Sequence, residues 1–103
     1  MLGGLATITG HSRVFFNAIN AYRLYSSSSG GILFASYAEV VSVKNSNFYN
    51  LVGSGGAPID IRSVAETVEF TNNTFGLLMV ESFMYISSSP FNFTRNSVQR
   101  VET

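Results

Sequence analysis

The chain has 103 residues, of which 46% are hydrophobic and only 12% are charged, about half the charged fraction of an ordinary soluble domain. The six basic and six acidic residues are scattered singly, which argues against nucleic acid or an anionic membrane surface as a partner, since both need a basic patch. With no cysteine, the chain has neither a disulfide framework nor a thiolate metal site. No apolar run reaches the length of a membrane-spanning helix.

Residues 3–29 form the first of four imperfect repeats. This repeat opens with Gly3 and Gly4, continues with predicted strands at residues 5–8 and 13–17, and ends in the polar run 26–29. Phe, Tyr, Val, Ile and Thr are common in the chain, while the helix formers Lys, Glu, Gln and Ala are sparse. These segments therefore favour strands over helices.

In the second repeat, Gly30 and Gly31 precede predicted strands at residues 32–34, 40–43 and 47–49. Gly55 and Gly56 open the third repeat. They follow the previous pair by about 25 residues, and a period of this length is typical of solenoids. Three short strands in each repeat is the number expected for one coil of a β-helix.

The third repeat has predicted strands at residues 59–61, 67–70 and 74–75. Side chains alternate between the two faces of a strand. The alternation predicts a buried face with Ile59, Ile61, Val68 and Phe70, and a solvated face with Asp60 and Glu69.

The fourth repeat lacks a glycine pair and has predicted strands at residues 84–86, 91–93 and 96–98. Degenerate outer repeats are expected where a stack ends. The fold class is therefore all-β: a parallel β-helix of about four coils, each of roughly 23–29 residues with three short strands. Residues 1–103 are expected to be a single β-helix segment that belongs to a longer solenoid.

Two columns of like side chains follow when the second strands are aligned. An inward apolar column contains Val14, Val43, Phe70 and Phe93, and a polar column at the next corner contains Asn17, Ser46, Asn73 and Asn96. Stacked coils lie about 4.8 Å apart, so like side chains pack on one another. Asn and Ser suit tight turns, and each glycine pair supplies positive φ at another corner.

These residues carry a resemblance to a known repeat. The segments Gly30-Gly31-Ile32 and Gly55-Gly56-Ala57, with Phe70-Thr71-Asn72-Asn73 and Phe93-Thr94-Arg95-Asn96, resemble the GG[AIL] and FxxN motifs of the polymorphic outer membrane protein type of right-handed parallel β-helix. That repeat lies within the pectate-lyase-like group. The resemblance implies a secreted or cell-surface solenoid, passenger-like or stalk-like, that serves adhesion or display.

The resemblance also makes an enzyme the competing interpretation, because pectate-lyase-like β-helices include lyases and glycosidases. Both chemistries need clustered acids, whereas Asp60 is the only aspartate. With Arg62 it is expected on a solvated strand face, and the aligned residues one coil away, Leu33 and Tyr85, are not acidic. Glu66 and Glu69 are interpreted in the same way. We therefore expect no catalytic residue in this chain.

No metal or cofactor site is expected. His11 is the only histidine, and an exposed turn position explains it better than a metal site or a catalytic triad, which would need partners. No glycine pair precedes a lysine and a helix, so none is interpreted as a phosphate loop.

Aromatic and glycosylation signals are weak. Five tyrosines could form a strip for sugar rings, but only Tyr85 falls on a predicted outward strand position, so core or corner packing is preferred for the others. Asn72 and Asn92 begin two sequons. Asn92 is expected to be accessible, and Asn72 to serve the corner.

The preferred function is a non-enzymatic structural or adhesive β-solenoid segment of a secreted or cell-surface protein. The alternative is a carbohydrate-binding or carbohydrate-active β-helix, lyase-like or glycosidase-like, whose active site lies outside this chain. The expected partners are neighbouring coils of a longer chain, or a second copy stacked end to end, because open strand edges pair with other chains. Surface glycans or proteins are further candidates, and the sequence indicates no specific ligand.

Overall fold

The computed structural model describes residues 6–22, 25–26, 33–53, 57–76, 78–79, 84–98 and 101–102. These residues form strands and contain no helix that could cross a membrane. The strands are β1 (Ala6–Thr9), β2 (Arg13–Asn17), β3 (Asn20–Tyr22), β4 (Tyr25–Ser26), β5 (Leu33–Ser36), β6 (Val40–Lys44), β7 (Asn47–Tyr49), β8 (Val52–Gly53), β9 (Ile59–Arg62), β10 (Thr67–Thr71), β11 (Thr74–Gly76), β12 (Leu78–Met79), β13 (Met84–Ser87), β14 (Phe91–Thr94), β15 (Ser97–Val98) and β16 (Val101–Glu102).

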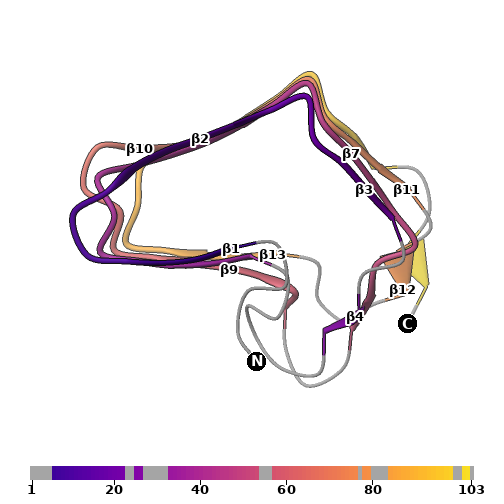
Figure 1. The fold of residues 1–103 in the computed structure, drawn as a ribbon, viewed down its shortest axis with the longest axis horizontal. Helices are drawn as coiled ribbons and strands as arrows, with labels where there is room; N and C mark the ends of the chain where they lie inside the picture. Colours follow the sequence, from indigo (N-terminus) through magenta and orange to yellow (C-terminus); the bar gives the residue numbers. More distant parts are fainter. Residues whose placement is uncertain are drawn as a thin grey trace.

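Four successive strands make one coil, and each strand pairs in parallel with its equivalents in the neighbouring coils (Figure 1). Sheet A is β1-β5-β9-β13, sheet B is β2-β6-β10-β14, sheet C is β3-β7-β11-β15 and sheet D is β4-β8-β12-β16. Sheets A to C contain most of the strand residues, whereas every strand of sheet D has only two. The predicted parallel β-helix is confirmed, and sheet D is an addition that the sequence did not predict.

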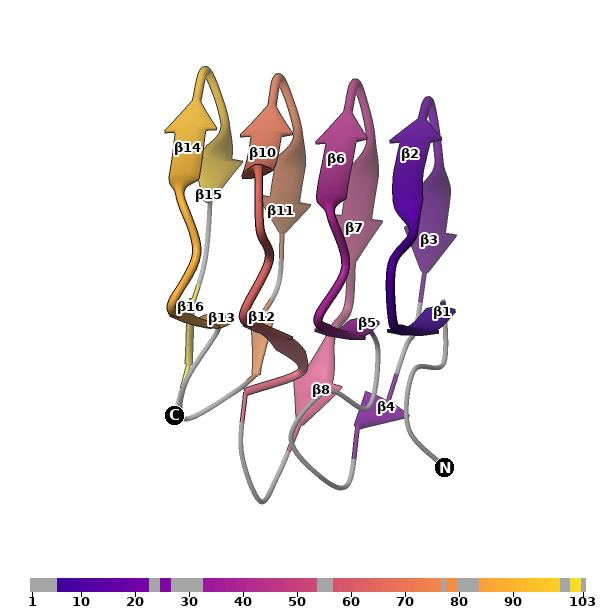
Figure 2. The same ribbon diagram turned by 90° about the vertical axis from the view of Figure 1, so that its left-hand side faces the viewer.

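The coil length agrees with the predicted period. Asn20 pairs with Asn47 in the next coil, at a separation of 27 residues. Asn73 contacts its equivalent Asn96 at a separation of 23 residues. With the N-terminal coil nearest the viewer, the chain runs clockwise from β1 through β2 to β3 and recedes with each coil, so the helix is right-handed (Figures 1 and 2).

The core lies inside the coils and consists of inward columns from sheets A, B and C. Phe70 is 0% exposed and pairs with Val43 on one side and Phe93 on the other. Phe75 stacks on Phe48 with ring centroids 5.1 Å apart. The predicted inward positions Ile59, Ile61, Val68 and Phe70 are all buried. The alternation therefore identified the core face correctly.

The register of the first coil differs from the prediction. Phe16, not Val14, pairs with Val43, so the inward column is Phe16, Val43, Phe70 and Phe93. Asn17 pairs with Lys44 and is therefore two residues away from the polar column that was assigned to it. A shift of two residues keeps every side chain on its own face, so the pattern alone does not distinguish the two registers.

Two corners of every coil, one between sheets A and B and one between sheets B and C, have a column of residues with positive φ. Between sheets B and C this column is Ala18, Asn45, Asn72 and Arg95, with φ of 57°, 54°, 57° and 52°. The backbone N–H of Asn45 donates to the Thr71 carbonyl of the next coil at 3.1 Å. Asparagine tolerates this conformation better than most residues. The glycine pairs predicted at another corner, Gly3, Gly4, Gly30, Gly31, Gly55 and Gly56, lie outside the described residues.

Candidate functional site

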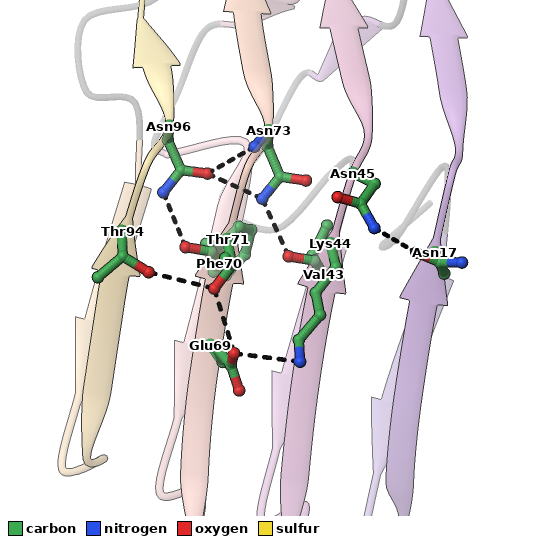
Figure 3. A network of polar contacts seen from close by, with 10 residues as sticks. All are labelled: Asn17, Val43, Lys44, Asn45, Glu69, Phe70, Thr71, Asn73, Thr94 and Asn96. Atoms are coloured by element: carbon green, nitrogen blue, oxygen red, sulfur yellow. Dashed lines mark hydrogen bonds and ion pairs between the residues drawn. The ribbon is translucent and has the colours of Figure 1, made fainter.

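A buried polar ladder runs along the corner between sheets B and C, and its rungs are Ser46, Asn73 and Asn96. Figure 3 shows the two asparagine rungs. Asn73 accepts a hydrogen bond on Oδ1 from the Ser46 N–H at 3.0 Å, and its Nδ2 donates to the Val43 carbonyl at 2.9 Å. Asn96 repeats both contacts with the Asn73 N–H and the Phe70 carbonyl, at 2.9 and 2.7 Å. Asn73 and Asn96 therefore each bond the backbone of the preceding coil at this corner.

A second ladder of amides lies on the outside of the same corner. Asn72 Nδ2 donates to Asn45 Oδ1 at 2.7 Å, and Asn45 Nδ2 donates to Asn17 Oδ1 at 2.9 Å. Asn17 is exposed and joins this outer ladder diagonally instead of the buried one. Its predicted place in the inner column was wrong, although it does contact a neighbouring coil at this corner.

Charged groups on the outer face of sheet B pair across coils. Glu69 lies 3.2 Å from Lys44 Nζ in the preceding coil and accepts a hydrogen bond from the Thr71 hydroxyl at 3.1 Å (Figure 3). The second and third coils are therefore joined by a polar contact on this face. Exposed pairs of this kind contribute little stability.

Arg13 bridges two carboxylates from successive coils. Its Nη1 lies 2.6 Å from Glu66 and 3.3 Å from Glu39. The hydrogen bond to Glu66 is the main cause that raises the Arg13 pKa above its ordinary value, so the guanidinium stays charged throughout the physiological range. His11 is highly exposed, with Nδ1 4.0 Å from Glu39. The exposed turn position predicted for His11 is confirmed.

Asp60 departs most clearly from its predicted surroundings. It alternates with the buried Ile59 and Ile61, as expected, yet it is only 1% exposed. Arg62 donates to both of its oxygens, from Nε at 2.8 Å and from an Nη at 3.1 Å. These hydrogen bonds raise the Arg62 pKa, and the guanidinium carbon lies 4.9 Å from the centre of the Tyr85 ring. The predicted solvated position of Asp60 was wrong.

The residues beside Asp60 also differ in part from the prediction. Asp60 pairs with Phe34 in the preceding coil, not with Leu33, and with Tyr85 in the following one. Neither neighbour is acidic. Within the part of the chain that the structure describes, the geometry therefore gives a carboxylate that accepts hydrogen bonds from Arg62 and lies between two aromatic strand neighbours, neither of them acidic.

Substitution of Asp60 by alanine is expected to lower the free energy of unfolding by about 1–3 kcal/mol, because the buried hydrogen bonds are lost. Urea denaturation of the variant beside Glu66→Ala, which changes a half-exposed carboxylate, measures the difference. If both variants unfold at the urea concentration of the original chain, Asp60 is not buried in solution.

Two tyrosines, one exposed and one half-buried, stack on the outer face of sheet C. Tyr22 is 57% exposed, and its ring stacks on Tyr49 with centroids 5.7 Å apart and planes 9° apart. Asn47 donates to Asn20 at 2.9 Å two residues earlier on the same strands. Tyr85 lies on an outward strand position, as predicted, but Tyr22 and Tyr49 do as well, which the prediction missed. The two tyrosines are one coil length apart in the sequence, and that spacing was the available signal.

Both sequon asparagines are exposed. Asn92 lies on β14 in register with Glu69, so its predicted accessibility is confirmed. Asn72 is at the positive-φ corner and donates to Asn45. It therefore has the structural contact that the sequence suggested for it.

The described side chains contain no group of three or more metal-ligating residues. Comparison of the chain with protein-family models, with curated proteins and with solved structures gave no match. The arrangement of described residues therefore consists of structural ladders, ion pairs and stacked aromatic rings.

Proposed function

We propose that this chain is a non-enzymatic structural or adhesive β-solenoid segment of a secreted or cell-surface protein. The observation that carries the proposal is the continuity of its ladders. Parallel strand pairing links the four coils in sheets A, B and C. At the corner between sheets B and C, the amides of the buried ladder add hydrogen bonds from coil to coil. Such a stack is a stiff, repetitive body that suits a stalk or a display surface.

The motif resemblance supports a right-handed coil of the polymorphic outer membrane protein type, within the pectate-lyase-like group. Phe70 and Phe93 lie in one inward column, and Asn73 and Asn96 follow each of them by three residues as rungs of the buried ladder. This is the role that an FxxN motif requires. The resemblance is also the support for a secreted or cell-surface location.

The pairing of the carboxylates with basic residues supports a non-catalytic role. Each carboxylate whose side chain the structure describes is paired with a basic residue: Asp60 with Arg62, Glu39 and Glu66 with Arg13, and Glu69 with Lys44. General acid and base catalysis needs carboxylates that are positioned on a substrate with matched pKa values. Carboxylates engaged in these contacts serve the stack instead.

The second candidate is a carbohydrate-binding β-helix, with any catalytic centre outside this chain. The observation that favours it is the exposed Tyr22 ring stacked on Tyr49, beside the amides of Asn20 and Asn47. Aromatic faces with nearby hydrogen-bonding groups make amphipathic binding surfaces.

One experiment with two arms tests both candidates. An antibody raised against the folded chain is expected to label intact cells of the source organism, and labelling only after permeabilisation would contradict the surface location. In parallel, the folded chain is applied to an immobilised glycan panel. If it binds, and Tyr22→Ala removes the binding while Phe15→Ala at another exposed ring does not, the carbohydrate-binding candidate replaces the purely structural one.

A further inference from the structure

The buried polar ladder has a direction. Each rung reaches back to the coil before it: Asn96 to Phe70 and Asn73, and Asn73 to Val43 and Ser46. Ser46 does the same with its hydroxyl, which accepts a hydrogen bond from the Ile19 N–H at 3.1 Å. An incoming coil therefore supplies the side chain, and the coil already in place supplies a backbone N–H and a carbonyl.

The fourth coil has the equivalent backbone N–H and carbonyl on the side that faces away from the third coil. Phe93 and Asn96 occupy the positions of Phe70 and Asn73, and β14 and β15 are edge strands of sheets B and C. The Phe93 carbonyl and the Asn96 N–H therefore correspond to the groups that Asn96 itself bonds one coil earlier. A coil added here would complete both contacts with one Asn, or the N–H contact with one Ser.

The surroundings of this pair are apolar. Phe93 is 38% exposed and Val98 is 42% exposed, although their partners Phe70 and Phe75 in the third coil are 0% exposed. The difference is the area that a following coil would cover. We call the surface formed by Phe91, Phe93, Asn96 and Val98 the C-terminal face.

The opposite end of the stack does not match this face. The position equivalent to Ser46 and Asn73 is held in the first coil by Ile19, whose side chain is partly buried and packs against the core. If a second copy stacked head to tail, Ile19 would lie over the Asn96 N–H and the Phe93 carbonyl. Buried polar groups left without a partner cost free energy, so self-stacking is disfavoured.

We propose that the C-terminal face binds one further β-helix coil, an extended segment with an inward apolar residue followed three positions later by Asn or Ser, and that it rejects the first coil of a second copy. The proposal rests on the solenoid role proposed above and adds the chemistry of the partner. Strand addition supplies the main-chain hydrogen bonds, and the amide selects the register.

The test uses the full chain and a fluorescein-labelled peptide with the sequence of residues 67–76, which carries Phe70 and Asn73. The matched control is the same peptide with Asn73→Ile. Fluorescence anisotropy is expected to show binding of the first peptide that is at least about tenfold tighter than that of the control, since one lost hydrogen-bonding side chain has this effect. Val98→Lys in the chain, which places a charge on the face, is expected to abolish binding.

A second measurement uses self-association. In sedimentation velocity, the original chain and Ile19→Val are expected to remain monomeric, whereas Ile19→Asn gains concentration-dependent association that Val98→Lys removes. Equal binding of the two peptides, no binding of either, or tight self-association of the original chain that Val98→Lys removes would each overturn the inference. None of these outcomes affects the result of the antibody labelling of cells. The proposal for the C-terminal face can therefore be overturned without overturning the proposed function.

Discussion

Replacement of Phe70 by alanine is expected to lower the free energy of unfolding by about 3–5 kcal/mol. Phe70 is fully buried, and its ring lies 6.4, 6.2 and 6.3 Å from the rings of Phe75, Phe91 and Phe93. The truncation opens a cavity between coils whose backbones are fixed by strand pairing, so collapse around it is limited. Chemical denaturation followed by far-UV circular dichroism measures the loss.

The matched control is Phe15→Ala, because Phe15 is 66% exposed on the outer face of sheet B. That substitution is expected to change the free energy of unfolding by about 0.5 kcal/mol or less. If the two variants were equally destabilised, the inward column through Phe16, Val43, Phe70 and Phe93 would be wrong, and with it the register of sheet B.

The second large effect is expected at Asn73, where leucine keeps the volume but removes the amide. The Ser46 N–H then loses its buried acceptor, and the contacts to the Val43 carbonyl and Asn96 Oδ1 disappear. The expected loss is about 3 kcal/mol, from hydrogen bonds lost and a buried donor left without a partner. Hydrogen exchange adds a local measurement, because the Ser46 amide should lose protection beyond the global loss of stability.

Asn72→Gly is the matched control, one residue away. Asn72 is exposed with φ of 57°, a conformation that glycine adopts readily, and only the side-chain hydrogen bond to Asn45 is lost. A change within about 1 kcal/mol is expected. A larger loss for Asn72→Gly than for Asn73→Leu would mean that the outer ladder, and not the buried one, holds the coils together.

The sequence predicted the coil, the core face and most of the buried ladder because these features repeat. In the third and fourth coils the phenylalanine and the asparagine are three residues apart, Phe70 with Asn73 and Phe93 with Asn96. The alignment of these two coils was therefore correct. In the first coil, apolar residues at both Val14 and Phe16 satisfy the same alternation. Only the backbone pairing of Phe16 with Val43 distinguishes the two registers.

The burial of Asp60 could not be predicted for a different reason. Alternation shows which side of a strand a residue points to, but not what covers that side. Asp60 does lie opposite the core residues, and it is nevertheless enclosed, with Arg62 on both of its oxygens. The stacked pair of Tyr22 and Tyr49 was missed because the third strand of the first coil, Asn20–Tyr22, is too short to show its own alternation.

The lengths of the segments that connect the strands determine where the chain tolerates insertions. The number of residues from sheet B to sheet D is constant: the segments from Val40 to Val52 and from Thr67 to Met79 are equal in length. The number of residues from sheet A to sheet B varies, because the segment from Arg62 to Thr67 is one residue longer than the segment from Ser36 to Val40. Residues gained or lost at the corner between sheets A and B therefore lengthen or shorten a surface loop without shifting any ladder. The side of the coil from sheet B to sheet D therefore keeps a constant length, whereas the corner between sheets A and B tolerates insertions, and a lineage under selection for new surface contacts would be expected to vary there.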